Sequence, residues 1–154
     1  MSHSAPEPQQ PPQPQIEAQA RLAAIVESSD DAIVSKTLEG VIVSWNKGAE
    51  RIFGFSAAEA VGQPLDIIIP ESLRKRHWSG YLETVRTGTS RYGAGDVLAV
   101  PALRKNGERI SVEFTILPFH DRTGRTLGIA ATLRDVTKRF DEMKALRAAA
   151  IAKS

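Results

Sequence analysis

The stretch of residues 31–65 constrains the fold of this chain more than any other part, because it begins with two strand-like runs separated by a tight turn. Residues 31–37 and 41–45 are rich in apolar and β-branched side chains, which strands prefer. Gly40 lies between them and can adopt the positive φ that a short turn requires. The sequence therefore predicts a β-hairpin at this point.

A short helix is predicted directly after the hairpin. Asn46 has the side chain of a helix N-cap, since its oxygen can accept a hydrogen bond from a free backbone N–H in the first turn. Gly54 lies where a C-terminal stop is needed, because glycine adopts the left-handed conformation without steric cost. We expect the helix to cover residues 47–53.

The same stretch resembles the PAS sensory family. From Gly40 to Gly62 the chain reads GVIVSWNKGAERIFGFSAAEAVG, which matches the pattern G-x-I-x-x-W-N-x-x-A-E-x-x-F-G-F-S-x-x-E-x-x-G. The resemblance continues to about Thr137. It implies an α+β PAS fold, a five-stranded antiparallel sheet with helices on one face, flanked by N- and C-terminal helices. It also implies a sensory role in signal transduction.

Three later strand-like stretches complete the predicted sheet. Residues 91–104 and 108–117 are joined by a turn containing Asn106 and Gly107, a pair that strongly favours a hairpin. Residues 126–135 read as the last strand. With the helices grouped between the second and third strands, helices would cover one face of an antiparallel sheet. The concave face of that sheet is the expected ligand pocket.

The chain divides into one domain and three flanking segments. Residues 1–15 contain five prolines and four glutamines and too few apolar side chains to offset the entropy of ordering, so we expect a disordered tail. Helical spacing of apolar residues predicts a flanking helix over residues 16–28. The PAS domain is expected over residues 29–136, and a signal or linker helix over residues 137–154.

Composition argues against several classes of partner and compartment. A chain of 154 residues fits one domain of ordinary size. Its net charge of +2 is too small to indicate nucleic-acid binding. No apolar run approaches the roughly 18 residues of a membrane span. The N-terminus also lacks the pattern of a secretory signal peptide. We therefore expect a cytoplasmic protein with neither a membrane nor a nucleic acid as its partner.

The chain carries none of the motifs on which common catalytic sites depend. It has no Gly-x-Ser-x-Gly elbow, no phosphate-binding loop and no His-Glu-x-x-His, so we expect no enzymatic activity. The chain has no cysteine, which removes disulfides and thiolate metal sites. Within the PAS family it also removes the cysteinyl–flavin photoadduct and the thioester-bound chromophore.

The helix predicted over residues 70–86 raises the question of a ligand. Leu73, His77, Tyr81 and Val85 follow one another at four-residue spacing, so His77 lies in an otherwise apolar stripe. Two interpretations remain open. The imidazole could point at a buried ligand, or it could be a structural histidine bonded to backbone or water.

This helix also resembles the one in the heme-binding PAS domains of rhizobial oxygen-sensor kinases. Their proximal histidine lies ten residues before a Thr-Gly pair, as His77 lies ten residues before Thr87-Gly88. The resemblance implies heme b, with iron bound by His77. Those relatives carry a distal arginine nine residues after the glycine, where this chain has Val97. An apolar distal side would favour sensing of carbon monoxide, nitric oxide or redox state over tight oxygen binding.

The residues expected to contact such a cofactor, besides His77, are aromatic or aliphatic: Tyr81, Val97, Leu98, Phe114, Ile116 and Ile129. The alternative needs no cofactor. The strand residues of this set would then be ordinary core, and the domain would serve for dimerisation or protein interaction.

The last helix is expected to carry the output. Five residues after the final strand fall at alternating four- and three-residue spacing: Val136, Phe140, Met143, Arg147 and Ala150. The helix would either fold back on its own domain or act as a signal helix, with Asp135 and Thr137 as relay residues. We expect a homodimer through the terminal helices. Because the sequence ends at Ser154, output would pass to an unidentified partner or to the rest of a longer protein.

Overall fold

The computed structural model describes residues 12–87 and 98–152. Five strands form one antiparallel sheet in the order β2-β1-β5-β4-β3. The strands are β1 (Ala32–Thr37), β2 (Ile42–Trp45), β3 (Leu98–Leu103), β4 (Arg109–His120) and β5 (Thr126–Asp135). The helices are α1 (Gln13–Ser28), α2 (Lys47–Phe53), α3 (Ala57–Ala60), the 3-10 helix η1 (Leu65–Ile68), α4 (Glu71–Thr87) and α5 (Thr137–Ala152). The predicted α+β fold is confirmed.

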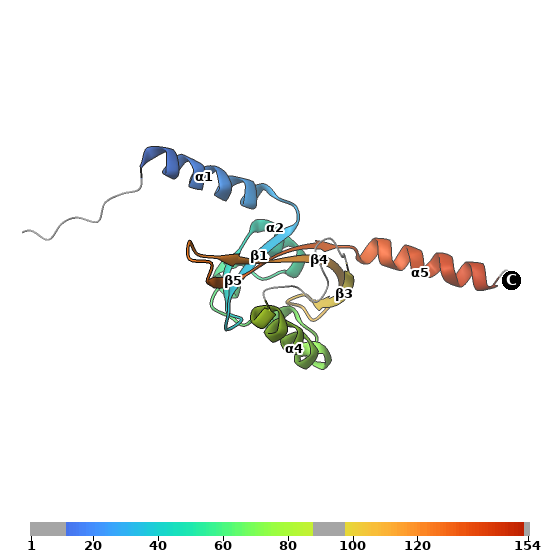
Figure 1. The fold of residues 1–154 in the computed structure, drawn as a ribbon. Helices are drawn as coiled ribbons and strands as arrows, with labels where there is room; N and C mark the ends of the chain where they lie inside the picture. The colour runs from blue at the N-terminus through green and yellow to red at the C-terminus, as the bar shows by residue number, and fades with distance from the viewer. Residues whose placement is uncertain (1–11, 88–97, 153–154) are drawn as a thin grey trace, which may run out of the picture.

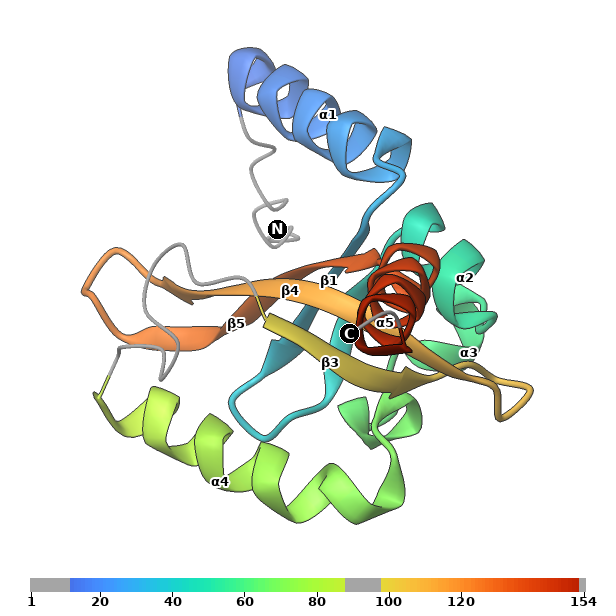
Figure 2. The same ribbon diagram turned by 90° about the vertical axis from the view of Figure 1, so that its right-hand side faces the viewer.

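The sheet has a helix-covered face and an open face. In Figure 1, α4 lies below the sheet, and Figure 2 shows α2 and α3 beside it. We call the face toward these helices the inner face. Its buried residues alternate along β1, as a half-buried strand requires. They join residues from β2, β3, β4, β5 and the short helices in one core, whose largest buried members include Phe53, Ile42, Val34 and Val112.

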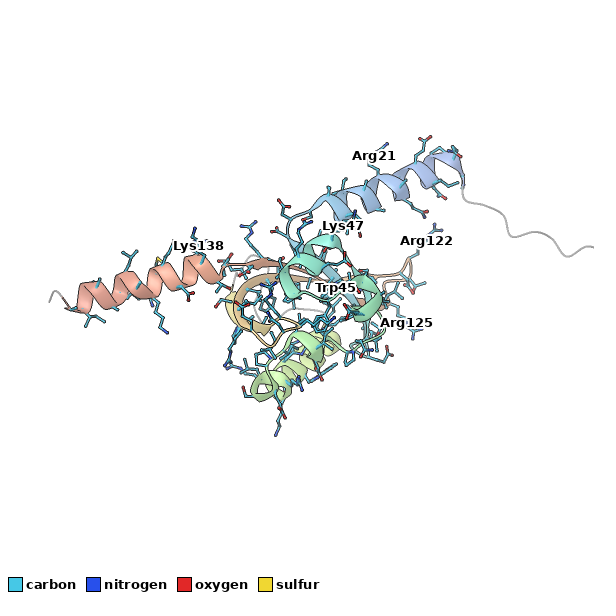
Figure 3. The ribbon with its side chains drawn as sticks, turned by 180° about the vertical axis from the view of Figure 1, so that it is seen from behind. Arg21, Trp45, Lys47, Arg122, Arg125 and Lys138 are labelled. Atoms are coloured by element: carbon cyan, nitrogen blue, oxygen red, sulfur yellow. The ribbon has the colours of Figure 1, made fainter. Side chains whose placement is uncertain are left out.

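Local signals fix the hairpin and α2 as the sequence predicts. The Oδ1 atom of Asn46 accepts a hydrogen bond from the amide of Ala49 at 2.9 Å, which caps the first turn of α2. Gly54 ends the helix with φ of 82°, in the left-handed region. Trp45, labelled in Figure 3, packs its ring 5.5 Å from that of Phe53. The short helix is thereby anchored to the sheet.

Asn46 also ties the N-terminal helix to the domain. Its side chain is 1% exposed, and Nδ2 donates to the carbonyl oxygen of Val26 in α1 at 2.8 Å and to that of Asp31 at 3.0 Å. Oδ1 accepts a second hydrogen bond from Ile33 at 2.9 Å. One buried side-chain amide therefore hydrogen-bonds to backbone groups of α1, β1 and α2. These bonds fix the position of the C-terminal end of α1 relative to the sheet.

The two terminal helices project from the domain in different directions (Figure 1). No residue of α1 is buried, and α5 contacts the sheet mainly through β4, near the start of the helix. Figure 3 shows Arg21 on α1 and Lys138 on α5 at opposite sides of the molecule. The interpretation in which the last helix folds back on its own domain is therefore wrong for this structure.

Most element boundaries lie within one residue of the sequence prediction, and the larger differences are in α1, β4 and β3. Helix α1 begins at Gln13 rather than at Ile16, because Pro14 is compatible with the first turn of a helix, where no hydrogen-bonded N–H is needed. Strand β4 continues to His120, since β5 supplies pairing partners that far. Strand β3 begins at Leu98, and the part of its prediction before that residue lies outside the described residues. None of the helices in the described ranges has both the length and the apolar character of a membrane-spanning segment.

Candidate functional site

Strand register places a lysine on the inner face of the sheet. Lys36 of β1 pairs with Ile129 of β5, which pairs in turn with Pro118 of β4. Paired residues of adjacent antiparallel strands point to the same face. Lys36 is only 6% exposed. A buried lysine needs partners for its charge, so its surroundings define a polar site within an apolar face.

One polar neighbour of Lys36 is the predicted ligand residue, His77. The Nζ atom of Lys36 lies 3.4 Å from Nε2 of His77, a long hydrogen bond that joins β1 to α4 across 41 residues of sequence. The same ammonium lies 5.9 Å from the ring centre of Trp78, within reach of a cation–π interaction. The histidine of the apolar stripe therefore faces β1, and its Nε2 atom contacts a cation.

An acidic residue holds the neighbouring tryptophan. The indole Nε1 of Trp78 donates to Oδ1 of Asp66 in η1 at 2.7 Å. The ring of Trp78 lies against Gly40, where a Cβ atom would come within 2.0 Å of Cη2, and Gly40 has φ of 85°. Glycine is therefore required at this turn both for its conformation and for the space that the indole occupies. Lys36, Asp66, His77 and Trp78 form one cluster, which we call the inner-face polar cluster.

Burial and nearby charges shift the pKa values of two members of this cluster, Lys36 and His77. Burial lowers the pKa of Lys36 to about 8, and the carboxylate of Asp66 opposes that shift. Burial, followed by the charge of Lys36, lowers the pKa of His77 to about 4, again opposed by Asp66. At neutral pH the cluster therefore holds an ammonium beside a neutral imidazole.

With these charges, the contact with Lys36 favours one tautomer of His77. An ammonium only donates hydrogen bonds, so Nε2 of the neutral ring is the acceptor and the ring proton is on Nδ1. A neutral imidazole with its lone pair on Nε2 is also the form that binds a metal ion. The donor chemistry of His77 thus fits the predicted role as a heme ligand, while the geometry places Lys36 at the atom that iron would take.

Three of the other predicted ligand residues lie on the inner face of the sheet, and the side chains of the remaining three lie outside the described residues. Phe114 and Ile116 are half-buried on the inner face of β4, and Ile129 is 3% exposed on β5. Phe114 packs partly against the hydrophobic core, as an ordinary core residue does. Leu98 pairs with Phe114 at the start of β3, but its side chain, like that of Tyr81 on α4, lies outside the described residues. Val97 lies outside them altogether.

Three members of the polar cluster were not predicted from the sequence: Lys36, Asp66 and Trp78. A signal existed for the lysine. In β1 it follows Ala32 and Val34 at two-residue spacing, so strand alternation alone puts a charged side chain on the buried face. No comparable pattern marks Asp66 or Trp78, because their meeting depends on how η1 and α4 pack.

The predicted relay residues connect β5, β4 and α5. The amide of Thr137 donates to Oδ1 of Asp135 at 3.0 Å, and its hydroxyl donates to the same oxygen at 2.6 Å. The Thr137 hydroxyl also accepts from the amide of Ser111 on β4 at 3.0 Å. Val136, which lies between Asp135 and Thr137 in the chain, is buried, and its amide donates to the Ser111 carbonyl at 2.9 Å. The first turn of α5 is therefore bonded to two strands of the sheet.

A shallow, open groove lies beside this junction, and it is separate from the inner-face polar cluster. It is lined by Asp135, Thr137, Lys138, Asp141, Glu142 and Ala145. Within residues 12–87 and 98–152, no group of His, Cys, Asp or Glu side chains has an arrangement suited to a metal ion.

The other described histidine, His120, lies at the exposed end of β4, away from the inner-face polar cluster. Its Nδ1 atom forms a hydrogen bond of 3.0 Å with the hydroxyl of Thr126. Of the described histidines, only His77 therefore belongs to the candidate site.

Comparison with known families agrees with this architecture. The family model described as "PAS domain" matches residues 30–138. That range includes the whole sheet, the inner-face polar cluster and the start of α5. The chain belongs to the PAS domain family, whose members serve as sensory modules in signal transduction.

Two curated relatives are each 32% identical to this chain. One is an uncharacterized protein of Azorhizobium caulinodans, aligned over 130 residues, or 84% of this chain and 17% of that protein. The other is the sensor protein FixL of Bradyrhizobium diazoefficiens, aligned over 98 residues, or 64% of this chain and 19% of that protein. The chain therefore spans less than a fifth of the length of each of these two relatives.

Solved structures show the same fold. The PAS domain of a Colwellia psychrerythraea protein superimposes with a TM-score of 0.70 at 26% identity, covering 79% of this chain and 98% of that one. An RNA-binding light-oxygen-voltage receptor superimposes with a TM-score of 0.72 at 20% identity, covering 98% of this chain and 42% of that one. The second match includes both terminal helices within its covered range.

Proposed function

We propose that this PAS domain senses a small ligand on its inner face and that the ligand is heme b, with iron bound by Nε2 of His77. The observation that carries the proposal is the half-buried imidazole of His77, whose Nε2 atom faces β1 on the inner face of the sheet. The similarity to the sensor protein FixL of Bradyrhizobium diazoefficiens, at 32% identity, lends further support. The resemblance of the α4 sequence to heme-binding PAS domains points the same way.

His77 would hold the iron, and Phe114, Ile116 and Ile129 would supply an apolar wall that limits water. When bound, heme supplies an iron that changes redox state or takes a diatomic gas. The apolar side chains named here would not donate a hydrogen bond to bound oxygen. We therefore expect carbon monoxide, nitric oxide or redox state, rather than oxygen, as the signal.

The output would pass through the junction of β4, β5 and α5. Asp135 and Thr137 fasten α5 to the sheet, so a shift of the sheet would change the first turn of that helix. A ligand can do this only as far as it binds one arrangement more tightly than the other. Exposed apolar residues on both terminal helices support a homodimer: Leu22, Ile25, Met143, Leu146 and Ile151. We assign no catalytic role.

The test is the absorption spectrum of purified protein after hemin addition and desalting. The wild type should retain about one heme per chain and show a Soret band in ferric, ferrous and carbon monoxide forms. His77→Ala should lose or strongly shift that band, whereas His120→Ala should behave as the wild type. In His77→Gly, added imidazole should restore the spectrum, which separates loss of the ligand from loss of the fold.

A cofactor-free interaction module is the second candidate, and one observation favours it. Lys36 contacts the Nε2 atom of His77, as a structural cluster between β1 and α4 would require. In that case neither the wild type nor any variant would retain hemin after desalting. The proposed heme function would then be wrong, and dimerisation or protein binding would be the role of the domain.

A further inference from the structure

A buried cation and the candidate iron ligand contact each other directly. Lys36 leaves β1 on the inner face, and its Nζ lies 3.4 Å from Nε2 of His77. The side chain is 6% exposed, so the contact is shielded from bulk water. A polar contact in such surroundings is stronger than at the surface, because water competes less for either partner.

One ring nitrogen cannot serve two partners at once. The Nε2 atom of a neutral imidazole has a single lone pair, and it lies in the plane of the ring. A hydrogen bond from an ammonium uses that lone pair, and so does a bond to iron. Binding of a metal at Nε2 therefore requires the Lys36 ammonium to leave.

We propose that Lys36 controls access to the Nε2 atom of His77, by occupying that atom in the ligand-free domain and withdrawing when heme iron takes it. This inference rests on the proposed heme function and adds a residue that sets the affinity of the site. In the ligand-free state, Lys36 also holds the ring in the tautomer that iron requires. The lysine thus both prepares the ligand nitrogen and competes for it.

The cluster offers the displaced ammonium other favourable neighbours. The face of Trp78 lies 5.9 Å from Nζ. Asp66, which accepts from the Trp78 indole at 2.7 Å, places a carboxylate close enough to act on the charge of Lys36. The ammonium can therefore leave Nε2 without becoming an isolated buried charge, whose cost would prevent ligand binding.

Replacing Lys36 by methionine removes the competitor and keeps most of the side-chain volume. A hydrogen bond to a charged group contributes enough to change an equilibrium by about tenfold to a hundredfold. We expect Lys36→Met to bind hemin about tenfold or more tightly than the wild type in an equilibrium titration followed at the Soret band. Lys75→Met, on the exposed side of α4, is the matched control and should leave the affinity unchanged. Equal or weaker binding by Lys36→Met would overturn the inference while leaving the heme function intact.

A second measurement tests the contact without heme. The ring nitrogen chemical shifts of His77 in hemin-free protein report which nitrogen carries the proton. The wild type and Lys75→Met should show the Nδ1–H tautomer, and Lys36→Met should show a larger share of the Nε2–H form. If no variant retains hemin, the proposed function fails. An Nε2–H tautomer in the wild type would overturn the Lys36 contact itself.

Discussion

The hydroxyl of Thr137, the first residue of α5, accepts a hydrogen bond from the amide of Ser111 on β4 at 3.0 Å. The two residues are 26 positions apart in the chain, so this bond links the helix to a strand other than the one that leads into it. Together with the bond from Val136 to the Ser111 carbonyl at 2.9 Å, it makes β4 a support for the first turn of α5. The orientation of the helix therefore depends on the sheet.

Substitution of Thr137 by valine tests this support. Valine keeps the shape of threonine but cannot accept from Ser111, so we expect a loss of about 1 kcal/mol in the free energy of unfolding. Hydrogen exchange at the Ser111 amide should become faster. Thr123→Val, in the exposed turn between β4 and β5, is the control and should leave that amide unchanged. Unchanged exchange in Thr137→Val would show that the hydroxyl does not support the helix.

Gly40 should tolerate no side chain, because its turn conformation and the indole of Trp78 both require glycine. A Cβ atom there would lie 2.0 Å from Trp78 Cη2, in addition to the cost of φ at 85°. We expect Gly40→Ala to destabilise the domain by about 2 kcal/mol or more in chemical denaturation. Gly62 is the matched control, since it also has positive φ but nothing within 4 Å of the added atom. Equal losses in the two variants would mean that packing against Trp78 contributes nothing.

The titration of His77 should make the hemin-free domain less stable in acid. Burial lowers its pKa from 6.5 to about 4, so between these values the unfolded chain binds a proton that the folded domain does not. Stability therefore falls as pH decreases through this range, by up to roughly 3 kcal/mol. His77→Leu should lose this part of the pH dependence, whereas His120→Leu should keep it. Thermal unfolding from pH 7 to pH 4 measures the difference, and parallel curves for wild type and His77→Leu would contradict it.

The terminal helices should mediate self-association. Leu22 on α1 is 63% exposed and Leu146 on α5 is 66% exposed, and burial of such side chains between copies would favour a dimer. Light scattering should give a dimer at micromolar concentration for the wild type and a lower mass for Leu22→Glu or Leu146→Glu. Leu117 on β4 is 69% exposed, so Leu117→Glu is a control for the added charge. A monomeric wild type at high micromolar concentration would contradict this dimer.

Much of the fold follows from local signals in the sequence. The cap at Asn46, the stop at Gly54 and the Asn106-Gly107 turn act within a few residues, so the elements that they bound could be predicted. The structure adds a second role for Asn46, because its amide also bonds to the carbonyl of Val26 in α1. That contact depends on how the helix leaves the sheet, which no local pattern specifies.

The candidate site was predicted less completely, for a physical reason. His77 could be singled out because it interrupts an apolar stripe on one helix. Its partner Lys36 lies 41 residues away on β1, and the contact exists only because α4 packs across that strand. Alternation along β1 marks the lysine as buried, but it does not identify the side chain that it meets. The pairing of a cation with the candidate iron ligand therefore emerges from tertiary structure.

The most direct test of the central claim is hydrogen exchange in hemin-loaded and hemin-free wild type. The claim is that occupation of the inner face at His77 changes the start of α5. Loading should change deuterium uptake in peptides that contain Ser111 and Val136, with little effect on the turn over residues 121–125. The same peptides should not respond to hemin in His77→Ala. Identical uptake at Ser111 and Val136, in wild type that holds heme through His77, would contradict the claim that this domain transmits its ligand state to α5.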